Sequence, residues 1–139
     1  MSYAIEDLSP GMSAGFAKTV SERDIALFGE VSGDTNPVHF DETFASTTPF
    51  KGRIAHGMLT ASYISTVLGM QMPGPGTIFL GLNIRFKAPV RIGDVVTARC
   101  TVRDILAERR RVVFDCACTV GDTVVLEGEA TVMPPARKA

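Results

Sequence analysis

The sequence predicts an α+β fold in which one long apolar helix is followed by an antiparallel sheet. Residues 56–70 form the most apolar segment, and their nonpolar side chains cover most of the circumference of a helix. After the turn-forming segment 73–76, which reads Pro-Gly-Pro-Gly, nonpolar and polar residues alternate with a period of two. Strands with one apolar face need an apolar partner, and the preceding helix is the natural one.

Two shorter helices are predicted before the apolar segment. Ser21 and Asp24 have the spacing of a capping box, and nonpolar residues recur at helical spacing from there until Gly33, a residue typical of helix ends. Asp41 is a suitable N-cap for a further short turn. The long helix over 56–70 is expected to be buried on nearly all sides, because only small hydroxyl residues interrupt its nonpolar side chains.

Four strands with alternating polarity follow, and a fifth is expected near the N-terminus. The predicted strands are residues 13–20, 78–86, 96–103, 112–120 and 124–132. Each strand is expected to have one buried face and one wetter face, as in an antiparallel sheet with a single core side. Such a sheet leaves an unpaired edge and an incompletely covered apolar face, so a homodimer is expected.

The composition is typical of a globular protein, with one domain expected over residues 1–139. Nonpolar residues make up 45% of the chain and charged residues 21%, which is far from a disordered composition. The formal net charge is −1, so no basic surface indicates nucleic acid or an anionic membrane as a partner. The apolar segment 57–72 contains several polar residues, which makes it too interrupted for a membrane span.

The N-terminus and the cysteines predict a cytoplasmic protein. The first seven residues are acidic rather than basic, and they lack the pattern of a signal peptide. The cysteines are odd in number and lie in apolar, strand-like runs, so they are expected to be buried and reduced. They are Cys100, Cys116 and Cys118.

A carboxylate and an imidazole lie five residues apart after the first helix. Pro37 fixes its own φ angle and drives Asn36 out of the helical region, so the first helix cannot continue from Asp34 to His39. The chain should loop back there and present both side chains to one site. Such a pair can exchange protons with a substrate.

A second motif, His56-Gly57-Met58, stands at the start of the long helix. The first N–H groups of a helix have no acceptor within it, so those near Gly57 could bind a polarised carbonyl oxygen. Glycine also lets a substrate approach closely, because it has no Cβ. His56 should stay neutral beside the positive end of the helix dipole, where it either braces the neighbouring loop or caps the helix.

No metal or nucleotide cofactor is expected. The two histidines lie seventeen positions apart, and the sequence has neither a His-Glu-x-x-His motif nor a Cys-x-x-Cys pair. It also lacks the glycine-rich loops that bind nucleotide phosphates.

These motifs resemble those of the (R)-specific enoyl-CoA hydratases, the MaoC-like or hydratase-2 family. The similar positions are residues 28–39, Ala45, His56-Gly57-Met58, residues 86–90 and Gly93-Asp94. The resemblance implies a hot-dog fold, in which a five-stranded antiparallel sheet wraps around the central helix. It also implies an acyl-CoA substrate and the addition of water to trans-2-enoyl-CoA. The product, (R)-3-hydroxyacyl-CoA, would link fatty-acid metabolism to polyhydroxyalkanoate precursors.

The same resemblance implies roles for individual residues. Asp34 and His39 would bind the catalytic water, and the N–H of Gly57 would face the thioester oxygen as a third catalytic group. The expected substrate-binding residues are Asn36, His56, Ser65 and Lys87.

Two other functions stay open at this point. A hot-dog acyl-CoA thioesterase has a similar architecture, but such enzymes typically carry their carboxylate on the central helix or in a different loop motif, and residues 56–70 contain no acidic residue. A non-catalytic acyl-CoA-binding domain would keep the fold and lose Asp34 or His39, and both residues are present. The sequence also leaves open which of these two acts as base, and whether the acyl carrier is coenzyme A or a carrier protein.

Overall fold

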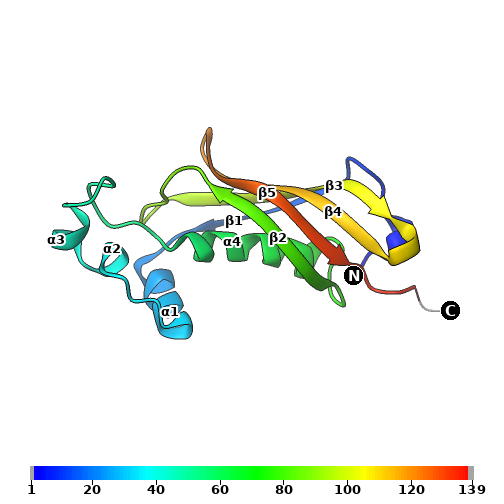
Figure 1. Cartoon of the computed structure of the whole chain (residues 1–139), viewed down its shortest axis with the longest axis horizontal. Coiled ribbons are helices and arrows are strands. Elements are labelled where there is room, and N and C mark those ends of the chain that lie inside the picture. The colour runs from blue at the N-terminus through cyan, green and yellow to red at the C-terminus, as the bar shows by residue number, and fades with distance from the viewer. Residues whose placement is uncertain (1, 138–139) are drawn as a thin grey trace.

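The computed structural model describes residues 2–137, so the first and the last two residues of the predicted domain lie outside the described residues. Five antiparallel strands form one sheet in the order β1-β3-β4-β5-β2. Helix α4 (Gly57–Thr66) lies along one face, and the sheet curves over it (Figure 1). The strands are β1 Ser13–Thr19, β2 Ile78–Phe86, β3 Val95–Leu106, β4 Arg111–Val120 and β5 Thr123–Met133. The single-turn 3-10 helices are η1 Ile5–Asp7 and η3 Ala107–Arg109. The predicted α+β arrangement is confirmed.

The core lies between α4 and the inner face of the sheet. Its fully buried side chains include Ile64 from α4, Phe114 from β4 and Leu126 from β5. The three cysteines are buried, free thiols, as predicted. The expectation that the long helix is buried on nearly all sides is wrong, because the sheet covers one side only. The residues of α4 that are exposed on the other side are Met58, Ser62 and Ser65. The helix ends in a π-helical turn, η2 (Val67–Gln71).

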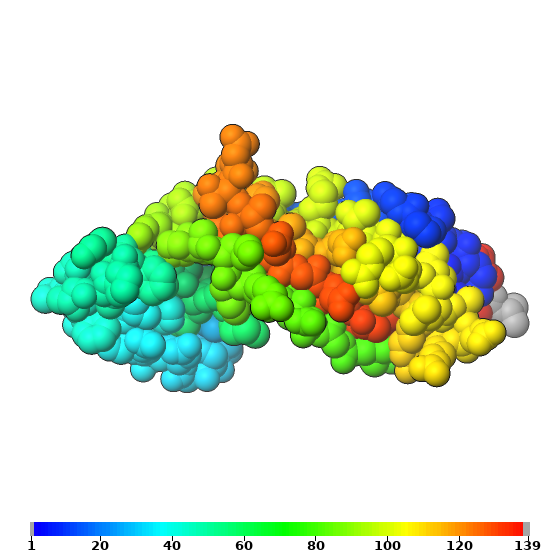
Figure 2. Space-filling model, turned by 45° about the horizontal axis from the view of Figure 1, so that its top comes forward, coloured from blue at the N-terminus to red at the C-terminus, as the bar shows by residue number. Residues whose placement is uncertain are grey.

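Strand β2 departs from the predicted pattern of one buried face. Its exposed nonpolar side chains are Ile78, Phe79, Leu80, Leu82 and Phe86, with exposed fractions of 38–55%. The reason is its place in the sheet: β2 is one of the two outer strands and pairs only with β5, whereas α4 packs against β3 and β4. In Figure 2, β2 (green) lies on the visible surface of the molecule. The β2 edge of the sheet is therefore apolar, and the described residues leave it uncovered.

Short helices precede α4 and project beyond one end of the sheet (Figure 1). Helix α1 (Glu22–Ser32) begins after the N-cap Ser21 and ends at Gly33, whose φ of 78° lies in the left-handed region that glycine adopts readily. Helix α3 (Glu42–Ala45) begins after its N-cap, Asp41. Both predicted helices are thus confirmed. Among the described residues, no helix is long and apolar enough to cross a membrane.

A further helix, α2 (Pro37–Phe40), lies where the sequence predicted only a loop. The side-chain oxygen of Asn36 accepts a hydrogen bond from the N–H of Val38 at 3.1 Å and so caps this helix. Pro37 occupies the first helical position, where a backbone N–H would have no acceptor within the helix, so the lack of an N–H in proline breaks no helical hydrogen bond. His39 consequently lies on a helical turn rather than on a loop.

Candidate active site

Asp34, His39 and His56 come together at the N-terminal end of α4. One potential ligand atom from each side chain lies within 4.8 Å of the others. Asp34 is exposed, whereas His39 and His56 are buried. The N–H of Asn36 donates to Oδ1 of Asp34 at 3.2 Å, which holds the carboxylate in the turn between α1 and α2. The turn and the two helices therefore bring an exposed carboxylate against two buried imidazoles.

The hydrogen bond at Nδ1 of His39 defines the tautomer of its ring. Nδ1 lies 2.9 Å from the carbonyl oxygen of Ile54. A carbonyl only accepts, so Nδ1 carries the proton and Nε2 has a lone pair when the ring is neutral. Burial lowers the pKa of His39, and the neighbouring His56 lowers it further, while the bond to Ile54 and the charge of Asp34 act in the opposite direction. The balance favours a neutral ring that can accept a proton at Nε2.

His56 braces the loop that carries Asp34. Its Nε2 lies 2.9 Å from the main-chain oxygen of Asp34, to which it donates. Its ring stacks on that of His39, with centroids 3.9 Å apart and planes inclined by 30°. His56 occupies the N-cap position of α4 but makes no side-chain capping bond. Of the two roles expected for this residue, bracing is the one that the structure shows.

The stacked arrangement of the imidazoles does not favour a metal site. A spacing of 4.8 Å among the ligand atoms of Asp34, His39 and His56 is within the reach of one ion. However, one nitrogen of each ring already donates to a main-chain carbonyl, and the remaining lone pairs lie in the planes of two stacked rings instead of being directed from separate sides at one point. Such a geometry fits a proton-exchanging pair with a supporting ring better than a tetrahedral ligand set.

Gly57 is the first residue of α4, directly beside this cluster. Its N–H and the next one belong to the first turn, which has no acceptors within the helix. A Cβ at Gly57 would lie 2.7 Å from Cε1 of Phe86, at the end of β2. The Phe86 side chain is 55% exposed and can move away. Phe86 therefore crowds the position of a side chain at Gly57.

An apolar cavity of about 410 Å³ opens beside Gly57, within the range of small-molecule sites. Its lining includes Ile54, Gly57, Met58, Thr60, Phe86 and Lys87. The half-exposed Lys87 is 3.7 Å from the Glu127 carboxylate. Ser65, in contrast, lies on the exposed side of α4 and is not among the residues that line this cavity. Of the expected site residues, Asp34, His39, His56 and Gly57 are thus grouped at one end of α4, and Lys87 shares the cavity with Gly57.

Two residues at this site were not anticipated. Ile54 acts through its carbonyl oxygen, a group that every residue has, so no side-chain pattern could have revealed it. Thr60 lies one turn after Gly57, and its Oγ1 is buried without a hydrogen-bond partner among residues 2–137. A hydroxyl at that helical spacing was the available signal.

Comparisons with known proteins show which family the chain resembles. Residues 7–130 match the model of the MaoC-like domain. The chain is 58% identical to the (R)-specific enoyl-CoA hydratase of Rhodospirillum rubrum over 97% of its length and 94% of that protein. It is 47% identical to the 3-hydroxybutyryl-CoA dehydratase of Methylorubrum extorquens, over 96% of this chain and 85% of that protein.

A solved structure supports the fold. The R-hydratase PhaJ1 from Pseudomonas aeruginosa superimposes with a TM-score of 0.91 at 40% identity, over 99% of this chain and 89% of the other. The expected hot-dog fold, an antiparallel sheet wrapped around a central helix, is thereby confirmed. With the match over residues 7–130 and the identity to curated hydratases, the chain belongs to the MaoC-like domain family.

Proposed function

We propose that this protein is an enoyl-CoA hydratase, a lyase that adds water to trans-2-enoyl-CoA to give (R)-3-hydroxyacyl-CoA. The observation that carries this proposal is the grouping of Asp34 and His39 within 4.8 Å, next to the first turn of α4. The relatives named as an (R)-specific enoyl-CoA hydratase and as a 3-hydroxybutyryl-CoA dehydratase support it. These two names describe opposite directions of one reversible reaction.

The reaction needs a base for water, a proton for the α-carbon and donors for the thioester oxygen. Asp34 and the neutral His39 bind the water between them. The pair accepts one proton as the remaining hydroxide forms a bond to the β-carbon, and then delivers a proton to the α-carbon. Between these events, negative charge develops on the thioester oxygen. The N–H of Gly57 and the dipole of α4 stabilise that charge.

Further roles follow for the expected substrate-binding residues. Asn36 holds the carboxylate of Asp34 through its N–H and caps α2 with its side chain. His56 holds the main chain of Asp34. We assign both to the support of the catalytic pair. Lys87, beside the cavity at Gly57, meets the coenzyme A portion. Ser65 lies on the exposed side of α4, outside that cavity, so we assign it no contact with the substrate.

The decisive experiment measures hydration of crotonyl-CoA by the loss of enoyl absorbance, together with the chirality of the product. Asp34→Asn and His39→Ala should each lower the rate by at least about a hundredfold while the protein stays folded, because a positioned acid or base contributes that much. The double variant should be little worse than the poorer single one, since the two groups act as a unit.

Asp41→Asn is the matched control, because Asp41 caps α3 in the same part of the molecule and asparagine also caps well. It should retain the activity of the unchanged protein. Near-normal hydration by either Asp34→Asn or His39→Ala would remove the proposal. Release of free coenzyme A in place of hydration would indicate a thioesterase instead.

We also propose that the protein is a homodimer in which the β2 edges of two copies pair. Unpaired backbone groups and exposed nonpolar side chains together make β2 a template for another strand. Sedimentation at micromolar concentration should give about twice the chain mass of 14.9 kDa or a higher even multiple. Leu80→Lys and Leu82→Lys should shift the mass towards the monomer. A clean, active monomer of the unchanged chain would contradict the dimer.

A further inference from the structure

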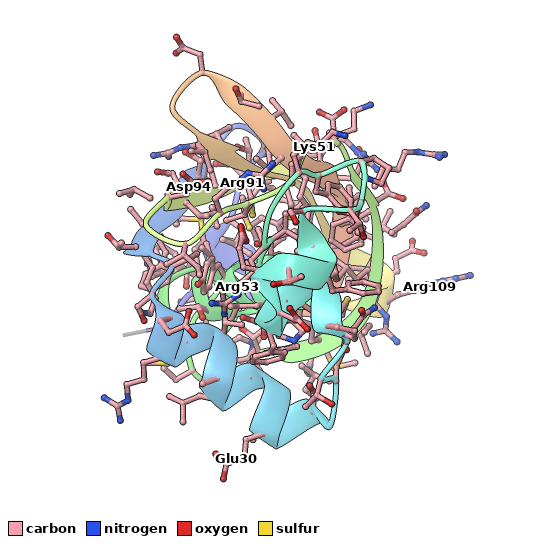
Figure 3. The ribbon with its side chains drawn as sticks, turned by 90° about the vertical axis from the view of Figure 1, so that its left-hand side faces the viewer. Glu30, Lys51, Arg53, Arg91, Asp94 and Arg109 are labelled. Carbon is pink, nitrogen blue, oxygen red and sulfur yellow. The ribbon has the colours of Figure 1, made fainter. Side chains whose placement is uncertain are left out.

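The side chain of Arg53 joins three parts of the chain at the active-site end of the molecule. Its Nε donates to the carbonyl oxygen of His39 at 2.7 Å. Its Nη2 lies 2.9 Å from the carboxylate of Glu22, at the start of α1. The Arg53 side chain is only 18% exposed, in contrast to 61% for Glu22. In Figure 3, Arg53 lies where α1 and the two short helices meet.

The segment of Arg53 and Ile54 holds His39 at two different points. Arg53 binds the main-chain oxygen of His39, and the carbonyl of Ile54 accepts from Nδ1 of its ring. The N–H of Ile54 donates to the carbonyl of Val38, one residue earlier in α2, at 3.3 Å. These three bonds define both the place of α2 and the direction of the His39 ring.

Helix α2 depends on such contacts because it has only four residues. A helix this short is not stable by itself, and its last carbonyl groups have no partners within the helix. A guanidinium group at the C-terminal end satisfies one of these carbonyls and interacts favourably with the negative end of the dipole. Its planar set of donors can serve His39 and Glu22 simultaneously, which a lysine ammonium on a flexible chain does less well.

We infer that Arg53 is a positioning residue that, by binding the main chain of His39 and anchoring it to α1, holds the His39 ring in the geometry needed for proton transfer. This inference rests on the proposed function, because it assumes that His39 exchanges protons with the substrate. Arg53 acts through His39, to whose main chain it binds, and not on the reacting atoms.

A neighbouring arginine offers a matched control. Arg91 donates to the main-chain oxygens of Arg53, at 3.4 Å, and of Phe50, and its own N–H donates to Asp94. It therefore supports the same loop without a hydrogen bond to His39. Figure 3 shows Arg91 above Arg53, next to Lys51 and Asp94.

The test compares Arg53→Gln, Arg53→Lys, Glu22→Gln and Arg91→Lys in crotonyl-CoA hydration, with kcat and KM measured separately over a range of pH. Arg53→Gln should lower kcat about tenfold or more, with KM changed by less than about twofold, since a small displacement of a catalytic group has effects of this order. Arg53→Lys should recover part of the loss. Glu22→Gln keeps an acceptor oxygen for Nη2 of Arg53, and Arg91→Lys keeps a cation at a position that makes no hydrogen bond to His39. Both variants should therefore stay within about threefold of the unchanged protein.

The pH profile distinguishes positioning from general support of the fold. The titratable and charged groups next to His39 are Asp34, His56 and Arg53. When α2 is released, His39 becomes more hydrated, and the acid limb of kcat/KM should move to higher pH in Arg53→Gln. A lower melting temperature in Arg53→Gln with unchanged kcat and an unchanged acid limb would overturn the inference.

The Arg53→Lys variant keeps a cation at this place, so it provides the same comparison if Arg53→Gln does not fold. Normal kcat in both folded variants would also overturn the inference. The proposed function is tested separately: full activity of His39→Ala would remove it, whereas an inactive His39→Ala beside a normal Arg53→Gln would remove only the role of Arg53.

Discussion

Two groups of titratable side chains lie against the same helix, the imidazoles at the first turn of α4 and the thiols between its body and the sheet. His39 stacks on His56 at the first turn. In the core, Sγ of Cys116 lies 3.4 Å from Sγ of Cys100, its partner across β3 and β4. Cys118 lies 3.9 Å from the main-chain oxygen of Thr60 in α4. Burial lowers the pKa of His39 and raises the pKa of Cys118, so it favours the uncharged form of each.

The two groups differ in what their polar atoms can still do. His39 uses Nδ1 for the carbonyl of Ile54 and keeps Nε2 available beside an exposed carboxylate, that of Asp34. Cys100 and Cys116 bind each other inside the core, which raises the pKa of Cys100, and burial adds to this effect. The thiols are therefore enclosed with no free partner outside the core, whereas buried His39 keeps a directed lone pair next to an exposed carboxylate.

The largest of these effects is expected for a substitution at Gly57, in the first turn of α4 beside the imidazoles. Gly57→Ala should lower hydration on the order of 10²-fold, comparable to the loss of one oxyanion donor, because its Cβ would lie near the thioester oxygen. The melting temperature should stay unchanged or rise, since alanine stabilises a helix more than glycine does, by up to about 1 kcal/mol. Rates and melting temperature on the same preparation are the measurement.

The contact with Phe86 provides the control for this variant. A Cβ at Gly57 would lie 2.7 Å from the Phe86 ring, so the double variant Gly57→Ala/Phe86→Leu should be as slow as Gly57→Ala. Recovery of activity in the double variant would show that displacement of Phe86, and not loss of the oxyanion contact, caused the effect. A lower melting temperature with unaltered turnover would mean that Gly57 is needed for packing.

A second prediction concerns the acid side of the pH range. The pKa of His39 is lowered from its ordinary value of 6.5, chiefly by burial. Hydration should therefore persist below pH 6.5 and fall only as the pH passes the lowered value. The free energy of unfolding should also decrease towards acid pH. Below pH 6.5 the unfolded chain binds the proton of His39 more readily than the folded chain does, so the free energy of unfolding falls as the pH falls through the lowered pKa.

Urea unfolding at several pH values measures this effect, and His39→Gln serves as the comparison. In this variant the free energy of unfolding should decrease less as the pH is lowered, because the contribution of His39 is absent. An equal pH dependence in the two proteins would show that His39 is not held neutral by its surroundings.

The smallest effect is expected at the thiols, and on the alkaline side. Burial raises the pKa of Cys118 to about 12 from 9.0. Stability from this group is fully present below pH 9.0 and is lost as the pH rises towards about 12. At mildly alkaline pH, a thiol reagent should label the folded protein slowly and the urea-unfolded protein rapidly, and Cys118→Ala should leave hydration within about twofold. Rapid, complete labelling of the folded, active protein would contradict the contrast between the two groups.

Local patterns in the sequence were sufficient for much of the fold. Ser21 and Gly33 begin and end α1 as expected, because capping and left-handed ends depend on neighbouring residues only. The alternation of polarity located the four strands after α4, since the period of two follows from the geometry of each strand itself. The proton-exchanging pair was also predictable, because Asp34 and His39 are only five residues apart and Pro37 lies between them.

Other features were decided by tertiary structure, because they depend on groups that are far apart in the sequence or lack a side-chain signature. The exposure of β2 follows from the strand order, and alternation alone does not tell an outer strand from an inner one. The tautomer of His39 depends on a main-chain oxygen fifteen residues away, and the bracing of Asp34 on a ring twenty-two residues away. The sequence by itself therefore determined which residues could carry the chemistry. Only packing decided which nitrogen of His39 is available and which side chains hold it there.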